Sequence, residues 1–313
     1  MLTPEQIESH NRSITGSKVG VILSVSPFQS RYGLWAEMTG LVERVDVSTE
    51  RMRFGNYAEH MIDQIVEHEF GWTVEPGPAE GKTQEKYPMF YGLIDRFRTD
   101  CEPRRVLEYK NIDRIQLPAW EDEGPPAYYE AQCRFYSILW KMPCTLVAVF
   151  GGNTVRTYDF ERDEQVEAYI IRECLKFWDM VQNMEAPPVD GKGVTTTALA
   201  KLYPGNKLAL IDGDGSAEEL IRRRELFSAV EKRAKERKEA YSNELKSIIG
   251  EHEGILCASG IKATWKKTKD GVTFDEKRFA DENPKLYEKY IIPKPGHRRF
   301  LCNIPKKLKE IAS

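Results

Sequence analysis

The stretch "RRVLEYKNI", residues 104–112, decides how this chain is interpreted. Its apolar and aromatic residues are of types that favour a β-strand: Val106, Leu107, Tyr109 and Ile112. Glu108 and Lys110 lie two residues apart within it. Because side chains alternate along a strand, both project from one face, roughly 6.6 Å apart along the chain. An acid and a base side by side in what looks like an interior strand require an explanation.

Composition sets wide limits. The 313 residues are 41% hydrophobic and 30% charged, enough for a sizeable core in one large domain or two. The net charge of −3 gives no overall indication of nucleic-acid binding. Residues 216–313, however, hold 23 Lys and Arg against 16 Asp and Glu, which leaves the rest of the chain strongly acidic. An acidic metal site with a separate basic surface would give this pattern, and so would a solvated surface of mixed charge.

Cysteine usage and hydropathy predict a soluble, cytoplasmic protein with no membrane partner. The six cysteines form no C-x-x-C pair, so neither a zinc site nor an iron–sulfur cluster is indicated, and reduced thiols are expected. No run approaches about 18 apolar residues, and the N-terminus lacks a signal-peptide pattern.

The pattern along the chain predicts three parts: a core over residues 1–184, a linker over 185–215, and a charged helix with a small α+β region over 216–313. The linker is predicted from two adjacent prolines, several glycines and a run of threonines. Helices are expected at 3–10, 30–42, 49–70, 127–141, 162–184 and 216–249, and strands at 88–98, 104–111, 144–152 and 154–160.

Two further acids are candidates for a shared site. In "YGLIDRF" (91–97), Asp95 would share a strand face with Leu93 and Phe97, and a hairpin with 104–111 would bring it beside Glu108. Glu59 falls on the apolar side of the helix 49–70, where a carboxylate is costly unless it is paired or bound to a metal. Gly55, one turn earlier, would leave open space.

Three converging carboxylates repel one another, and a divalent cation would relieve that repulsion. Hard oxygen ligands suit Mg²⁺, with Mn²⁺ as a substitute, and two ions are expected. Lys110 could then orient or activate a water for phosphodiester hydrolysis. Other interpretations remain open from the residues alone. Glu108 and Lys110 could be a surface pair on an edge strand, and Asp95 could pair with Arg96 or Arg105.

The order of the motifs resembles the YqaJ-type viral recombinases, relatives of phage lambda exonuclease in the PD-(D/E)XK nuclease superfamily. The opening segment "RSITGSKVGVILSVSPFQSRYGLWAEMTG" (12–40) is followed by G-x-x-x-E (Gly55 to Glu59), G-x-x-D (Gly92 to Asp95), E-x-K (Glu108 to Lys110) and Y-x-x-Q (Tyr129 to Gln132). The resemblance covers about residues 10–182.

The resemblance implies an α/β fold, a restriction-endonuclease-like core with a central mixed β-sheet flanked by helices, followed by a C-terminal α+β extension. It implies that Glu59, Asp95, Glu108 and the main-chain carbonyl of Tyr109 hold the metals. Lys110 would assist the attacking water, and Gln132 would contact the site from its helix.

The family also implies that Arg12 and Ser17 hold a terminal 5′-phosphate. The chain departs from the family here in two ways. Relatives often have an acid where Lys18 follows the serine, and His10 lies where some relatives have the arginine. The choice between Arg12 and His10 therefore stays open.

The implied activity is a Mg²⁺-dependent 5′→3′ exonuclease on double-stranded DNA that releases 5′-mononucleotides and leaves 3′ single-stranded overhangs for recombination. A homotrimeric ring, a single-strand annealing partner and a phage or prophage origin within a bacterial host are implied with it. The alternatives are an endonuclease with the same site and a non-catalytic DNA-binding or assembly protein.

Aromatic side chains raise a separate question. Tyr129, Cys133, Tyr136 and Trp140 form a helical stripe that is expected to be core, as is Trp35. Trp120, in the loop 112–126, is expected to be exposed and able to stack on DNA. In the tail, a hairpin turning at 269–271 is expected, with basic residues suited to DNA phosphates or to a partner protein.

Overall fold

The computed structural model describes residues 4–43, 50–205, 209–294, 296 and 298–302. The chain divides into two compact units, Met1–Pro204 and Gly205–Ser313, and each is described by itself.

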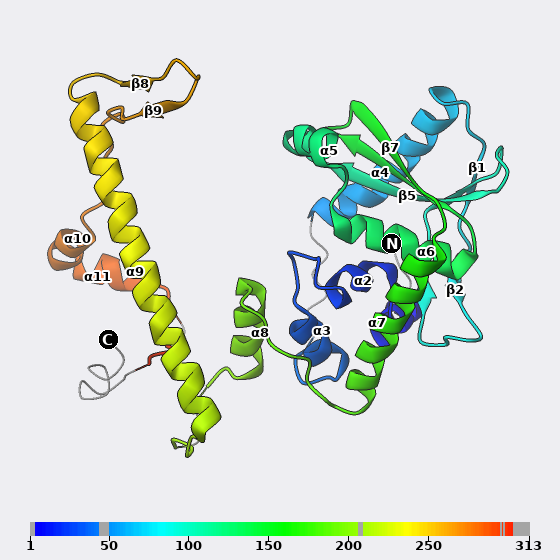
Figure 1. Ribbon diagram of the computed structural model, residues 1–313, viewed down its shortest axis with the longest axis horizontal. Coiled ribbons are helices and arrows are strands. Elements are labelled where there is room, and N and C mark those ends of the chain that lie inside the picture. Colours follow the sequence, from blue (N-terminus) through cyan, green and yellow to red (C-terminus); the bar gives the residue numbers. More distant parts are fainter. Residues whose placement is uncertain (1–3, 44–49, 206–208, 295, 297, 303–313) are drawn as a thin grey trace. The chain divides into compact units, whose positions relative to one another are not determined.

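The first unit is built on a five-stranded sheet with the order β1-β4-β5-β6-β7 (Figure 1). The strands are β1 (Val74–Pro76), β4 (Arg96–Arg98), β5 (Arg105–Ile112), β6 (Cys144–Phe150) and β7 (Thr154–Phe160). β5 and β6 are parallel, and the other neighbouring pairs are antiparallel. The predicted α/β class with a central mixed sheet is therefore confirmed. The alternative that placed Glu108 on an edge strand is wrong, because β5 lies between β4 and β6.

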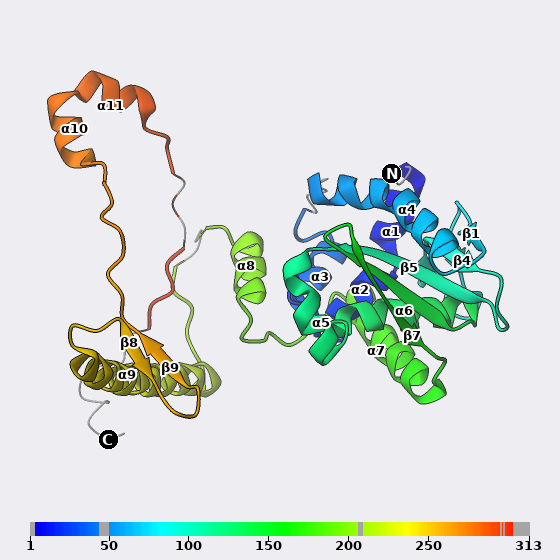
Figure 2. The same cartoon turned by 90° about the horizontal axis from the view of Figure 1, so that it is seen from above.

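Helices cover both faces of this sheet. They are α1 (Pro4–Arg12), α2 (Gly16–Ile22), α3 (Arg31–Met38), α4 (Glu50–His68), α5 (Leu117–Glu123), α6 (Ala127–Trp140), α7 (Glu164–Gln182) and α8 (Gly193–Leu202), with a 3₁₀ turn at Arg114–Gln116. Figure 2 shows α4 on one side of the sheet and α6 and α7 on the other. Because β5 and β6 are parallel, the chain must cross from the end of one strand back to the start of the other. The segment that contains α5 and α6 makes this connection.

The two faces have different cores. On the α4 side, Ala58, Ile62 and Val66 recur at i+4 spacing and pack on the β5 residues Leu107 and Tyr109. On the opposite side, α6 packs with α2, α3 and α7 in a larger cluster. Each side chain of β5 therefore faces one helical layer or the other, as the period of two requires.

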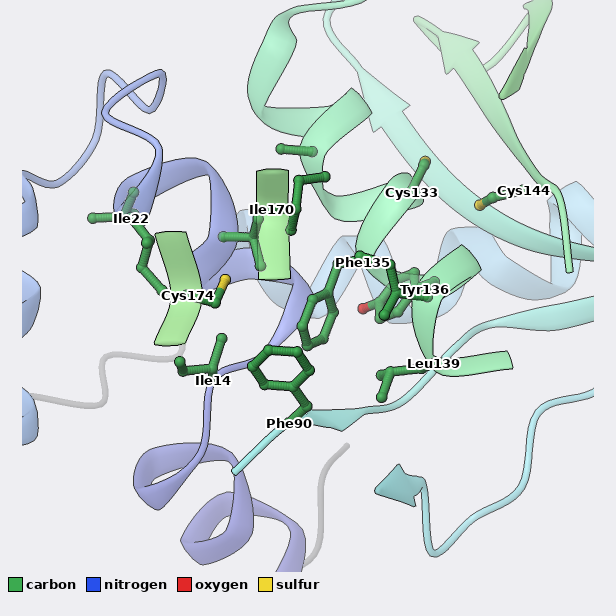
Figure 3. Packing of buried hydrophobic residues seen from close by; sticks show 14 of the residues in the cluster. Ile14, Ile22, Phe90, Cys133, Phe135, Tyr136, Leu139, Cys144, Ile170 and Cys174 are labelled. Atoms are coloured by element: carbon green, nitrogen blue, oxygen red, sulfur yellow. The ribbon is translucent and has the colours of Figure 1, made fainter. Parts of the chain in front are cut away.

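Aromatic rings fill the centre of the larger cluster (Figure 3). Phe90 and Phe135 are completely buried, with ring centroids 5.2 Å apart, and Ile14 and Leu139 lie beside them. Tyr136 belongs to the same cluster. The expectation that α6 buries its aromatic stripe is confirmed for Tyr136 and Trp140, and that for Trp35 on α3 is confirmed as well.

The predicted strand 88–98 is wrong as one continuous element. Only Tyr91–Gly92 (β3, paired with β2, Lys82–Thr83) and β4 are extended, and the chain bends at Asp95 between them. β4 does form the predicted hairpin with β5, with Arg96 opposite Leu107. Asp95 consequently lies just before the paired strand β4.

The predicted linker also contains structure. Residues 193–202 form α8, which packs on α3, where the side chain of Ala198 meets Gly33. Thr195 is buried, and its hydroxyl contacts the Asp190 carboxylate ahead of the helix. The sequence did not predict this helix, because glycine and threonine have low helix propensity. Packing of α8 on α3 stabilises the helix instead.

The second unit consists of a long charged helix and small elements. These are α9 (Gly215–Ile249), the hairpin β8 (Gly254–Leu256) and β9 (Lys262–Thr264), and the helices α10 (Glu276–Glu282) and α11 (Pro284–Tyr290). The predicted helix 216–249 is confirmed. The hairpin turns between 256 and 262 and not at 269–271. Among the described residues of this unit, Ile249 is the one buried apolar side chain.

No helix in the described ranges has the length and apolar character needed to cross a bilayer.

Candidate active site

Glu108 is the centre of the candidate site. It lies in the middle of β5, it is only 4% exposed, and it faces α6. Gln132 Nε2 on α6 donates to Glu108 Oε1 at 2.7 Å, and the Lys110 ammonium contacts the same oxygen. The prediction that Glu108 and Lys110 share a strand face is therefore confirmed, and Gln132 contacts Glu108 from its helix, as the family resemblance implied.

Asp95 is fixed by the main chain of the same strand. Its Oδ2 accepts the main-chain N–H of Tyr109 at 2.7 Å, so the bend before β4 turns the carboxylate toward β5. The alternative in which Asp95 pairs with Arg96 through its side chain does not apply. Arg96 Nη1 instead donates to the main-chain oxygen of Asp95 at 2.7 Å.

Glu59 approaches from the other helical layer. It lies on α4, which covers the face of the sheet opposite to Gln132, and its side chain is about a third exposed. Its Oε2 is 3.7 Å from Arg96 Nη1. A Cβ placed on Gly55 would meet nothing within 4 Å, so the open space expected one turn before Glu59 is present.

Electrostatic effects join the three acids. Burial, followed by the negative charge of Asp95, raises the pKa of Glu108 to about 8, although Lys110 opposes the shift. Burial also raises the pKa of Asp95, and burial with the charge of Asp95 raises that of Glu59. Asp95 is thus the common neighbour of the two glutamates. Burial is the largest cause of all three shifts, and the nearby cations offset it only in part.

The three acids are not grouped closely enough to coordinate one metal ion together. In the described part of the chain, no three His, Cys, Asp or Glu side chains are grouped so that they could hold a metal ion. Each acid instead has its own partner: Arg96 for Glu59, the Tyr109 N–H for Asp95, and Lys110 for Glu108.

Sequence reasoning missed the ion pair beside Glu59. Arg96 Nε and Nη2 donate to the carboxylate of Asp63 at 2.8 and 2.7 Å, and both side chains are mostly buried. Asp63 is four residues after Glu59 on α4, which places both acids on one helix face. That spacing was the available signal, and it could have identified Asp63 as a neighbour of the site.

A second polar cluster lies at the start of α2. The hydroxyls of Thr15 and Ser17 are 3.3 Å apart, and each lies within 3.2–3.3 Å of His10 Nε2. Arg12 is not part of it, since its side chain is 80% exposed and pairs with Glu8 on α1 at 2.9 Å. Of the two alternatives for this region, the structure brings His10, and not Arg12, to Ser17.

Lys18 is buried at the end of α1 and binds main-chain oxygens there. It is 5% exposed, and its ammonium donates to the main-chain oxygens of His10, Asn11 and Ser13 at the end of α1. A cation there satisfies the final carbonyls of a helix and its dipole. Lys18 therefore ties the end of α1 to α2.

The two clusters are connected through Tyr136. A Cβ on Gly16 would stand 2.8 Å from the Tyr136 ring, so only glycine permits this close approach. Gln132 Nε2 is 3.2 Å from the Tyr136 hydroxyl while it also holds Glu108. The turn that carries Ser17 is thus packed against the residue that braces the buried acids.

Trp120 is not where it was expected. It lies in α5, it is 2% exposed, and its ring packs against Tyr129, Phe150 and Tyr158. The prediction that it stacks on DNA is wrong, because the 117–123 segment folds as a helix and turns this ring into the core.

Comparison with known proteins finds a family model similar to the part of the chain that holds these residues. Residues 7–139 match the YqaJ-like viral recombinase domain. The predicted resemblance is confirmed. The matched segment contains the cluster at α2, all three acids, Lys110 and Gln132.

Similarity to one relative extends much further. The chain is 27% identical over 312 residues to the uncharacterized protein YqaJ of Bacillus subtilis (strain 168), which covers 96% of this chain and 94% of that protein. The second unit is therefore shared with this relative.

Two solved structures are similar in fold to part of the chain. Both are of the alkaline exonuclease LHK-Exo from Laribacter hongkongensis, one of them in complex with dAMP. Each covers 58% of this chain and 94% of the exonuclease, at 16% and 18% identity, with TM-scores of 0.48 and 0.49.

Proposed function

We propose that this chain is a Mg²⁺-dependent 5′→3′ exonuclease that acts on the ends of double-stranded DNA and leaves 3′ overhangs for recombination by strand annealing. The observation that carries the proposal is the pair of carboxylates, the partly buried Asp95 and the buried Glu108, held beside Lys110 within a segment that matches a viral recombinase domain.

The donor set fits a hard divalent cation. Glu59, Asp95, Glu108 and the main-chain carbonyl of Tyr109 would hold Mg²⁺ or Mn²⁺, since all are oxygen donors. A nearby dication would lower the raised pKa values of the buried acids by supplying the missing positive charge. When bound, such ions make a water nucleophilic and stabilise the departing 3′ oxygen.

The chain's own side chains would prepare the reaction. Gln132 and Lys110 both hold Oε1 of Glu108, so Oε2 is the oxygen that Glu108 would offer to a cation. The Lys110 ammonium beside it would be the group that orients the attacking water. The N–H of Tyr109 keeps the Asp95 carboxylate turned into the site.

End recognition would use the cluster at α2. The hydroxyls of Thr15 and Ser17 and the imidazole of His10 converge from two segments, and such groups suit a terminal 5′-phosphate. We assign His10 to this role in place of Arg12, whose side chain points to Glu8. A homotrimer with a single-strand annealing partner, in the cytoplasm of a bacterial host, completes the proposal.

The test compares three DNA substrates with Mg²⁺: linear duplex with 5′-phosphates, the same duplex with 5′-hydroxyls, and closed circles. Mononucleotides should appear fastest from the phosphorylated duplex and not at all from circles. Glu108→Gln and Lys110→Met should each lower the rate at least about 100-fold. Glu167→Gln is the matched control, because Glu167 is also a buried glutamate bound by a cation, Arg162, but lies on α7.

Two results would contradict the proposal. Cleavage of circles, indifferent to the 5′-phosphate, would identify an endonuclease with the same site. Equal inertness of wild type and variants with both Mg²⁺ and Mn²⁺ would identify a binding protein.

A further inference from the structure

A row of aromatic rings leads from the candidate active site to the surface. The Lys110 ammonium lies 5.6 Å from the centroid of the Tyr129 ring. The Tyr129 and Tyr128 centroids are 4.4 Å apart, and Tyr128 meets Phe28 at 5.5 Å with the ring planes at 79°. The outermost ring, Phe28, is 74% exposed.

Phe28 is more exposed to solvent than the other aromatic rings nearby. Trp120, which also contacts Tyr129, is almost completely buried, and Tyr128 and Tyr129 are partly buried. A phenylalanine ring left in water forgoes the free energy of burial. One exposed ring alone is ordinary, but this one continues a contiguous set of rings that ends at the group proposed to activate water.

The loop that carries Phe28 is held firmly. The main-chain N–H groups of Val25 and Ser26 both donate to the oxygen of Gly20 at 2.9 Å. Ser26 is buried, and its Oγ accepts the N–H of Phe28 at 3.3 Å. These bonds fix the position of Phe28 before any ligand arrives, which lowers the entropic cost of binding.

Neighbouring segments brace the same loop. The Lys192 ammonium donates to the main-chain oxygen of Ser24 at 2.6 Å. A Cβ on Gly20 would stand 2.7 Å from Cβ of Tyr128, so α2 and α6 approach closely only because residue 20 is glycine. Tyr128 thereby supports the Phe28 ring from a rigid helix.

We propose that Phe28, supported by Tyr128, is a stacking platform for a nucleobase of DNA near the end being processed. The inference rests on the proposed function, and it names a contact to the substrate of that site. A nucleobase is the occupant because its flat face matches an exposed ring and its phosphodiester leads to the acids. Stacking of this kind accepts any base, as an enzyme that digests DNA of every sequence requires.

The test measures base stacking directly, without cleavage. Duplexes carrying 2-aminopurine at successive positions from the 5′ end are mixed with the protein in EDTA, and both fluorescence quenching and anisotropy are recorded. Wild type should quench 2-aminopurine at one or two positions. Phe28→Ala should abolish that quenching and weaken binding roughly 5- to 150-fold, the range found for loss of one stacked base.

Two further variants separate stacking from a structural role. Phe28→Trp should restore both quenching and affinity, because it keeps a flat ring. Val25→Ala is the matched control, since Val25 is an exposed apolar residue (41%) of the same loop without a ring, and it should behave as wild type. In the presence of Mg²⁺, Phe28→Ala should raise KM and leave kcat nearly unchanged.

The possible outcomes distinguish the two proposals. If Phe28→Ala binds and quenches as wild type does, the platform is excluded, and Phe28 serves another purpose such as contact with a protein. If wild type quenches but never cleaves, the platform stands and the nuclease proposal fails. If wild type neither binds nor cleaves DNA, both fail.

Discussion

The two units of this chain use their apolar residues in opposite ways. In the first unit, α6 and the sheet enclose large completely buried side chains such as Phe135 and Phe150, and charged groups such as Glu108 and Lys18 are also buried. In the second, α9 leaves Leu220, Phe227 and other apolar side chains exposed. A dense core can hold carboxylates at raised pKa, because surrounding packing offsets the cost of burying charge. A helix without a core cannot do so, and the described acids of α9 lie on the surface.

The largest expected effect tests the core of the first unit. Phe135→Ala should lower the free energy of unfolding by about 3–5 kcal/mol, because it leaves a cavity beside Phe90 at the centre of the cluster. Chemical denaturation combined with hydrogen exchange in α6 would measure it. A loss below about 1 kcal/mol would mean that the region repacks and is less tightly organised than the rings in Figure 3 indicate.

The next effect concerns an ion pair in each unit. Arg96→Met removes the cation that Asp63 and Glu59 share and should cost about 2 kcal/mol, since the groups are largely shielded from water. Arg222→Met removes a matched pair with Glu218 on the exposed surface of α9 and should cost less than about 0.5 kcal/mol. Denaturant titration of the two variants is the measurement. Equal losses in the free energy of unfolding would contradict the proposed difference between the two units.

A pH dependence of stability is also expected. The pKa of Glu108 is raised from the ordinary 4.5 to about 8, so the folded state keeps a proton that the unfolded state releases. The contribution of Glu108 to the free energy of unfolding should therefore be present in full below about pH 4.5 and fall as pH rises to about 8, where it levels off. The raised pKa values of Asp95 and Glu59 act in the same direction.

Glu108→Gln should flatten this dependence. Unfolding in EDTA across this pH range would show it, and an unchanged slope in the variant would mean that Glu108 does not titrate as described.

The smallest effect is expected in the second unit. Phe227→Ala removes a ring that is 69% exposed, so the free energy of unfolding should change by no more than about 0.5 kcal/mol. Hydrogen exchange along α9 is the measurement. A loss close to that of Phe135→Ala would show that another molecule covers this helix face in solution.

Regular periodicity made much of the fold predictable. The run 144–150, apolar except for Thr145, predicts a buried strand, and the i+4 pattern of Ile62 and Val66 predicts the inner face of a helix. The alternation in 105–112 placed Glu108 and Lys110 on one face correctly. In each case, the side-chain pattern repeats with the period of the backbone.

The errors occurred where tertiary contacts overrule local pattern. Asp95 lies at a bend because its carboxylate is held by the N–H of a strand fourteen residues later. α8 forms because it packs on α3, and Trp120 is buried because three other rings surround it. The pairing of Arg96 with Asp63 joins segments more than thirty residues apart, and the spacing of Asp63 from Glu59 indicates the acid but not its partner.

Position 109 serves two layers of the protein through different atoms. Its N–H anchors Asp95, while its ring packs under α4 on the reverse face. Every amino acid except proline provides that N–H, so the anchor is indifferent to the identity of residue 109. Residue 109 can consequently change to suit its packing against α4, in evolution or by design, without displacing Asp95.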